Sequence, residues 1–147
     1  MSQENVEIVR QVFAEASRHA DRTGPVVDAL DHDSMAVVYE FLDPQIEFHT
    51  DPRLPEAGIY RGVEAVRARW GQFGESFDEF IYEAEDIIDL EDGRVLVLMR
   101  LHARGKDSGA RVEARPGWIY TTRHGLAVRI DAFLDRAQAL EAAGLSE

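Results

Sequence analysis

An arginine and a histidine two residues apart are the pair in this sequence with the clearest capacity for chemistry. Arg100 and His102 lie in an alternating run, so on a β-strand their side chains would share one face. A histidine titrates near neutral pH and can act as a general acid or base, and an arginine can hold a carboxylate, enolate or phenolate oxygen. The pair is also compatible with an outer face, paired to carboxylates such as Glu113 or Asp131. The face that they occupy therefore decides between a reactive site and surface ion pairs.

A second set of polar side chains alternates with a set of less polar ones between residues 46 and 51. The polar set is Glu47, His49 and Asp51, and the alternating set is Ile46, Phe48 and Thr50. Imidazole and carboxylate groups suit zinc, iron or manganese, but three alternating polar residues are also typical of the exposed face of an antiparallel strand. The sequence favours the strand, with no metal and with the polar set on the outside. Phe48 and Thr50 are then the candidate ligand-binding residues.

The elements that position these residues follow from hydrophobic periodicity. Apolar spacings of three and four predict helices over residues 3–20 and 63–80, a helix through Met35 that stops at Asp43-Pro44, and a short helix after Pro25. Alternation and turn signals predict strands over residues 81–90, 95–103, 111–122 and 127–134, and residues 135–143 suit a closing helix. Helices followed by hairpin-linked strands predict an α+β fold, with a curved antiparallel β-sheet wrapped around the N-terminal helices and an internal cavity.

Loop symmetry gives the expected strand register. A symmetric loop over residues 105–109 sets Arg100 opposite Ala114 and His102 opposite Val112, on one face with Leu98 and Trp118. A turn centred near His124 sets Trp118 opposite Ile130. A slip of one residue in either hairpin would exchange the faces. Inward-facing residues are thus expected to include Arg100 and His102, with the ligand-binding candidates Phe48, Thr50, Tyr60, Trp118 and Tyr120, and with Phe13 and Trp70 contributed by the helices.

Composition limits the functional class. A chain of 147 residues with 45% hydrophobic and 30% charged residues is typical of one globular domain, and no apolar run is long enough to span a bilayer. The first twenty residues carry too many charges for a secretion signal, so we expect a cytoplasmic protein. A net charge of −12 repels nucleic acid, and the absence of cysteine excludes disulfides and thiolate metal sites. No Gly-rich phosphate loop is present, and we expect no cofactor.

Four segments carry a resemblance to a known family: LDPQIEFHTDP, IYRGVEAVRARW, GRVLVLMRLHARGKDSGARVEA and RIDAFLDRAQALEAAGL. Together they resemble the SnoaL-like branch of the nuclear transport factor 2-like superfamily, which includes ketosteroid isomerase, polyketide cyclases and limonene epoxide hydrolase. The resemblance implies a single cone-shaped domain that binds a small, largely apolar metabolite. It also implies a homodimer, for which the apolar stripe Val95, Val97, Met99 and Leu101 would be the outer face.

The same resemblance offers two functions. One is cofactor-independent proton transfer of the isomerase, cyclase or hydratase type, and the other is a non-catalytic binding or dimerisation domain whose cavity is filled by its own side chains. By analogy with the polyketide cyclases, Asp131 on the last strand is a candidate base beside His102, with Arg100 stabilising an oxyanion. By analogy with ketosteroid isomerase, Phe13 falls near the oxyanion-hole tyrosine and Asp51 near the base. The acidic residues of the epoxide hydrolases fall at His102 and Ala132, which argues against that chemistry.

Overall fold

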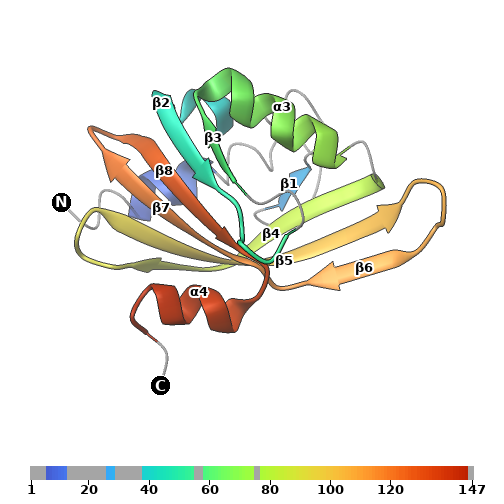
Figure 1. The fold of residues 1–147 in the computed structure, drawn as a ribbon. Coiled ribbons are helices and arrows are strands. Elements are labelled where there is room, and N and C mark those ends of the chain that lie inside the picture. Colours follow the sequence, from blue (N-terminus) through green and yellow to red (C-terminus); the bar gives the residue numbers. More distant parts are fainter. Residues whose placement is uncertain (1–5, 13–25, 29–37, 55–57, 75–76, 146–147) are drawn as a thin grey trace.

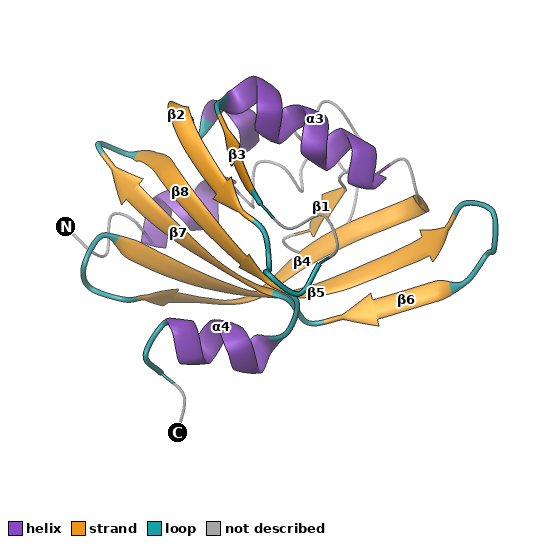
Figure 2. Cartoon of the chain, viewed as in Figure 1, coloured by secondary structure: helices purple, strands orange, loops and turns teal. Residues whose placement is uncertain are grey.

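The computed structural model describes residues 6–12, 26–28, 38–54, 58–74 and 77–145. It confirms the α+β prediction, because one curved sheet carries a helix on each of its faces (Figure 1). The strands follow the order β1-β4-β5-β7-β8-β2-β3, with β6 paired to β5 off that path. Helix α3 (Val63–Gly74) lies over the concave face, and helix α4 (Arg136–Ala142) lies against the opposite face (Figure 2). The expected helices over residues 3–20 and after Pro25 lie mostly outside the described residues, although residues 6–12 are helical.

The strand bounds place most of the sheet in the second half of the chain. The strands are β1 (Val26–Asp28), β2 (Leu42–His49), β3 (Ile59–Arg61), β4 (Phe77–Asp89), β5 (Arg94–Gly105), β6 (Arg111–Ala114), β7 (Gly117–Arg123) and β8 (Leu126–Phe133). The sheet is mixed rather than wholly antiparallel, because β2 pairs with β8 in parallel. This pairing brings the first long strand of the chain beside the last one.

Two predicted boundaries were wrong. The helix expected to continue to Phe80 ends at Gly74, and β4 begins at Phe77. Gly71 and Gly74 weaken the helix, while aromatic residues favour a strand that can pair with β5. The helix expected to stop at Asp43-Pro44 ends before β2 begins at Leu42. Pro44 is tolerated in β2 because the register shifts between Leu42 and Glu47, so that its missing N–H breaks no regular ladder.

The hairpin between β5 and β6 has a shorter loop than the symmetric five-residue loop expected from the sequence. Gly105 donates its N–H to the carbonyl of Ala110 at 2.8 Å, so only residues 106–109 form the loop. Leu101 therefore lies opposite Ala114 and His102 opposite Glu113, one residue away from the predicted register. An even loop in place of an odd one reverses which side chains of β5 face inward.

The faces of β5 are accordingly the reverse of the prediction. Val95, Val97 and Met99 are fully buried in the main core on the concave side, together with Ile46, Phe48 and Ile130. Leu96 and Leu98 form a second core on the convex side with Ile119 of β7, and Ala139 of α4 packs against them. The stripe from Val95 to Leu101 is thus interior and cannot be the outer dimer surface. The homodimer itself stays a prediction.

The hairpin between β7 and β8 keeps the predicted faces although its register also differs. His124 and Gly125 form a two-residue turn with φ values of 55° and 79°, and the pairing shifts again between Thr121 and Thr122. The turn and the register shift each move the pairing by one residue from the predicted register. Together they move it by two residues, which places Trp118 opposite Ala132 instead of Ile130. Because side chains alternate with a period of two, Trp118, Ile130 and Ala132 remain on the concave side, as the sequence predicted.

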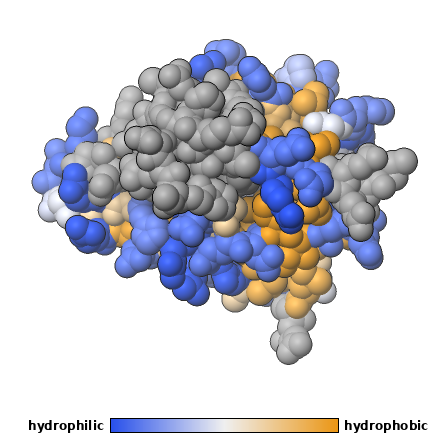
Figure 3. Space-filling view, turned by 180° about the vertical axis from the view of Figure 1, so that it is seen from behind, coloured by the Kyte–Doolittle hydropathy of each residue, from blue (hydrophilic) through white to orange (hydrophobic). Residues whose placement is uncertain are grey.

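None of the helices within the described ranges is both long and apolar enough to cross a membrane. Seen from behind, the described surface is largely hydrophilic, with hydrophobic residues gathered right of centre (Figure 3). The large hydrophobic side chains that are exposed in the described ranges are Ile59, Val112, Leu134 and Leu145. They come from separate elements of the chain.

Candidate functional site

A cavity of about 170 Å³ lies on the concave side of the sheet, below α3. Its walls are overwhelmingly apolar, and residues from β2, α3, β4, β5, β7 and β8 contribute to them. Six of the residues that define its shape are Phe48, Trp70, Tyr82, Met99, Trp118 and Tyr120. A mostly apolar, concave lining with few polar groups is the usual make-up of a small-molecule site.

Aromatic rings form one side of this cavity. The Phe48 ring meets Trp70 edge-on with centroids 5.5 Å apart and lies 5.4 Å from Trp118. Trp70 and Trp118 are 5.8 Å apart, and Tyr82 packs edge-on against Trp118 at 5.7 Å. Such offset and edge-to-face pairs hold ring orientations firmly. The strands and α3 therefore present fixed aromatic surfaces to anything that enters the cavity.

The structure places five of the seven predicted ligand-binding residues in the lining: Phe48, Thr50, Trp70, Trp118 and Tyr120. Tyr60 is half-buried and packs behind Phe48, with ring centroids 6.5 Å apart. Phe13 lies outside the described residues. The role of these residues in binding a ligand stays a prediction, but most of them line a common space.

Asp51 is the residue whose position departs most from the expected strand phase. The sequence set it on the outer face, whereas its side chain is only 1% exposed and belongs to the cavity wall. The strand ends at His49, so the alternation that predicted its direction no longer applies. Its carboxylate accepts hydrogen bonds from the backbone N–H groups of Arg53 and Leu134, at 2.9 and 2.8 Å.

The guanidinium of Arg53 completes the environment of Asp51. Its Nε and Nη2 donate to the two carboxylate oxygens at 3.1 and 2.8 Å, while Nη1 donates to Asp135, the N-cap of α4, at 3.0 Å. These bonds hold the pKa of Asp51 well below its usual range, at about 2, against the opposing effect of burial. Asp51 is thus a fixed anion that ties the segment after β2 to the start of α4.

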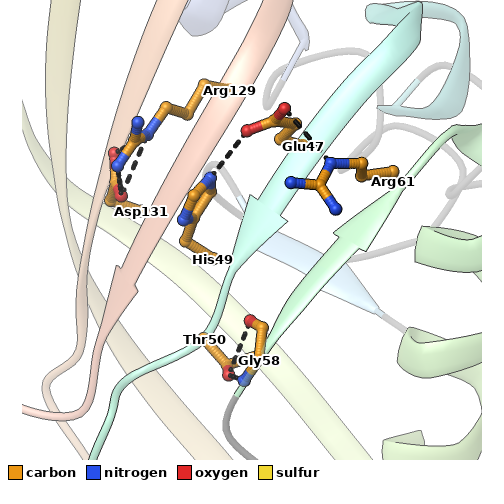
Figure 4. Close-up of polar contacts among 7 residues, drawn as sticks. All are labelled: Glu47, His49, Thr50, Gly58, Arg61, Arg129 and Asp131. Carbon is orange, nitrogen blue, oxygen red and sulfur yellow. Dashed lines mark hydrogen bonds and ion pairs between the residues drawn. The ribbon is translucent and has the colours of Figure 1, made fainter.

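The remaining polar groups of the lining are mostly neutral. The Thr50 hydroxyl donates to the carbonyl of Gly58 and accepts from its N–H, which closes the segment between β2 and β3 (Figure 4). Burial raises the pKa of Tyr82 and of Tyr120, so both phenols stay protonated at physiological pH. The indole Nε1 of Trp70 is buried without a hydrogen-bond acceptor among the described residues.

Arg100 and His102 lie on the convex side of β5, outside the cavity lining. This position contradicts the inward orientation expected from the sequence and follows from the shorter β5–β6 loop. Arg100 approaches Glu85 at 3.8 Å, and His102 Nδ1 lies 3.4 Å from a carboxylate oxygen of Glu113. Arg100 and His102 therefore lie on the outer face beside carboxylates, which is the alternative that the sequence left open.

Asp131 also lies on the convex side, in a bidentate ion pair with Arg129 at distances of 2.9–3.2 Å. On the neighbouring strand, His49 Nε2 lies 2.9 Å from Glu47, whose other oxygen accepts from Arg61 at 3.4 Å (Figure 4). The hydrogen bond with His49, followed by Arg61, lowers the pKa of Glu47. Within the described ranges no three His, Cys, Asp or Glu side chains are arranged to hold a metal ion. Glu47 and His49 are thus outer-face residues, as expected.

Tyr82, Met99 and Leu101 are among the lining residues that were not sequence candidates. Met99 and Leu101 were assigned to the outside because of the one-residue register error. Tyr82 lies opposite Leu101 in the β4–β5 pairing and so shares its face. The correct β5–β6 loop length would have identified Met99 and Leu101, whereas the face of Tyr82 depends on the separate β4–β5 register.

Comparison with known proteins agrees with this fold and cavity. A family model described as the SnoaL-like domain matches residues 25–130. The chain belongs to the SnoaL-like family. No curated protein matches the sequence. The resemblance found in the sequence is therefore confirmed for the family and the fold.

Three solved structures illustrate the fold of this SnoaL-like protein. A putative SnoaL-like polyketide cyclase from Jannaschia sp. has a TM-score of 0.71 and 19% identity, covering 99% of this chain and 94% of its own. TerC, co-crystallised with polyporic acid, has a TM-score of 0.68 and 14% identity, with 96% and 98% covered. A hypothetical protein with a ketosteroid isomerase-like fold from Catenulispora acidiphila, in complex with trimethylamine, has a TM-score of 0.64 and 11% identity, with 95% and 93% covered. At these identities the likeness concerns the fold alone.

Proposed function

We propose that this SnoaL-like protein binds a small, flat, largely apolar molecule in the cavity below α3. The observation that carries the proposal is an apolar space of about 170 Å³ with Phe48, Trp70 and Trp118 on one side. An engineered apolar cavity of about 150 Å³ in another protein is large enough to bind benzene. The space therefore suits a compound with about one ring and a short substituent.

Two of the similar structures support a ligand-binding role. TerC was crystallised with polyporic acid, and the Catenulispora protein with trimethylamine. The expected alternative of a cavity filled by its own side chains does not agree with the open space seen here. The open apolar cavity on the concave face thus supports binding of a metabolite.

Proton-transfer catalysis is the second candidate, favoured by the likeness to a putative polyketide cyclase. Such catalysis needs a group that can take a proton inside the cavity. In the described part of the lining, Asp51 is the carboxylate available, and four hydrogen bonds from Arg53 and Leu134 already occupy its oxygens. Asp131 and His102 lie on the other side of the sheet. We therefore place binding ahead of catalysis.

A thermal-shift assay with a panel of one-ring and two-ring aromatic compounds tests the proposal. Hydrophobic members of the panel are expected to raise the melting temperature of the wild type, because a ligand that binds only the folded state stabilises it. Trp118→Ala is expected to abolish the shift by removing part of the wall. His102→Ala, on the convex side, is the matched control and should keep the full shift. A panel that leaves the wild type unchanged, or an effect lost in the His102 variant alone, would overturn the proposal.

A further inference from the structure

Exposure to solvent differs sharply along the wall of the cavity. Val9, Phe41 and Tyr120 belong to the lining and are buried together in the main core. Leu134 also belongs to the lining, yet it is 44% exposed, whereas the other lining residues in the described ranges are buried or half-buried. A side chain that borders both the cavity and the solvent lies where the wall is thin. Leu134 therefore marks the place where the cavity is closest to the surface.

The strands bring Leu134 to one edge of the sheet together with other parts of the wall. β2 and β8 run in parallel, so their carboxyl ends, at His49 and Phe133, lie at the same edge (Figure 1). β7 begins at this edge as well, because Gly117 pairs with Phe133. The lining residues that follow β2 or β8, or precede β7, are Thr50, Asp51, Leu54, Ala114, Pro116 and Leu134. Most of these side chains are apolar.

Asp51 fixes the backbone of this edge. Its carboxylate accepts the N–H of Leu134 at 2.8 Å, and its carbonyl accepts the N–H of Leu54 at 3.0 Å. Arg53 donates to the same carboxylate and extends the network to Asp135 at the start of α4. A buried charge in an apolar wall is costly unless it has such partners. The hydrogen bonds of Asp51 thus hold Leu54 and Leu134 in fixed positions at the edge.

A second place on the wall, at Arg69 of α3, is less suited to the passage of an apolar molecule. Arg69 lines the cavity and is half-buried, and its guanidinium lies 5.8 Å from the centroid of the Tyr60 ring. Passage there would disturb a favourable cation–π contact. At the sheet edge the same molecule passes leucine, alanine and proline side chains, and the charge of Asp51 is neutralised by Arg53.

We propose that a small apolar molecule enters and leaves the cavity past Leu134, and that this side chain limits the rates of both steps. The inference rests on the proposed binding function and identifies the route to the site. A side chain at an entrance is passed in both directions, so added bulk raises the barrier to entry and to exit equally. A residue deep in the wall, such as Trp118, contacts the bound molecule instead, and its loss changes the dissociation constant.

Exchange rates of acetophenone, a one-ring compound with a short substituent, test the route. Line-shape analysis of the methyl signal of Met99, which lines the cavity, gives the association and dissociation rate constants during an NMR titration of the full chain. Leu134→Trp should lower both rate constants by the same factor, about tenfold, and change the dissociation constant by less than about twofold. Leu134→Ala removes bulk and should raise both rate constants together by about twofold or more.

Two further variants control for effects away from the proposed entrance. Leu145→Trp is the matched control, because Leu145 is also 44% exposed but does not belong to the described lining. Arg69→Ala removes a side chain from the second place on the wall. Both variants should keep the wild-type rate constants within about twofold. Melting curves establish that all four variants are folded.

Each contrary outcome identifies what has failed. Wild-type rate constants in both Leu134 variants, with acetophenone still bound, would overturn the entrance and leave the binding function intact. Faster exchange in Arg69→Ala alone would place the entrance at α3. A changed dissociation constant in Leu134→Trp with an unchanged association rate would make Leu134 a contact of the bound molecule rather than part of the entrance. A Met99 signal that does not respond to acetophenone in the wild type would overturn the binding function and this inference with it.

Discussion

The two faces of the curved sheet are formed by the same strands but differ in the kind of side chain that they carry. On the concave face, aromatic and aliphatic side chains surround a cavity whose polar groups are mostly neutral. On the convex face, polar and charged residues are paired with one another, as in Glu47–His49, Arg129–Asp131 and His102–Glu113, and α4 covers an apolar area. The residues that the sequence suggests as acids, bases or oxyanion donors therefore form ion pairs and hydrogen bonds at the surface. The candidate site consists mainly of aromatic and aliphatic residues of the kind found in hydrophobic cores.

Asp51 is an exception to this division, because it is a buried charge on the concave side. Asp51→Asn should destabilise the protein by about 2 to 3 kcal/mol, since the amide cannot accept all four hydrogen bonds and Arg53 keeps only Asp135 as an ion-pair partner. Asp131→Asn, which breaks a convex-face ion pair, should cost no more than about 1 kcal/mol. Urea denaturation at neutral pH measures both, and equal losses would contradict the distinction between the faces.

The same carboxylate predicts an acid dependence. The pKa of Asp51 is lowered in the folded state to about 2, so its contribution to stability is complete above about pH 4 and is lost as the pH falls towards 2. A depression of this size corresponds to about 2 kcal/mol. Between pH 5 and pH 2, the wild type should therefore lose about 2 kcal/mol more stability than Asp51→Asn loses over the same range. Urea denaturation of both proteins at several pH values measures this difference. Parallel pH profiles of the two proteins would contradict the ion pair.

The apolar part of the convex face gives a smaller expected effect. A Cβ on Gly117 would lie 2.3 Å from the Cβ of Ala139, so α4 packs directly on the backbone of β7. Gly117→Ala should destabilise the protein by about 1 to 3 kcal/mol through overpacking. Gly58→Ala, at which a new Cβ meets no atom within 4 Å, should change stability by less than about 0.5 kcal/mol. Equal melting temperatures for the two variants would show that α4 does not pack tightly against β7 at Gly117.

The sequence predicts the α+β architecture and the family well, since both rest on long periodic segments that tolerate small boundary errors. The face of each strand is less secure because it depends on the parity of a loop. The β5–β6 loop has one residue fewer than expected, and this single difference moves Arg100 and His102 outside and Met99 and Leu101 inside. In the β7–β8 hairpin, the turn and a register shift each change the parity, so Trp118 keeps its expected face.

Asp51 and the helix–strand boundary at Phe77 show a different limit of sequence reasoning. Alternation predicts where a side chain points only while the strand lasts, and β2 ends two residues before Asp51. The apolar spacing of Phe73, Phe77 and Phe80 suits a helix, but the long pairing of β4 with β5 determines the structure after Gly74. Both outcomes depend on contacts between segments that are distant in the sequence, which local patterns do not contain.

A methyl-resolved NMR titration with acetophenone tests the central claim most directly, because β5 carries probes on both faces. Met99 and Leu101 line the cavity, whereas Leu96 and Leu98 belong to the convex core under α4. Binding in the cavity predicts that the methyl signals of Met99 and Leu101 shift with added acetophenone while those of Leu96 and Leu98 stay in place. Shifts confined to Leu96 and Leu98, or no shift at any of the four residues, would contradict a ligand-binding concave face.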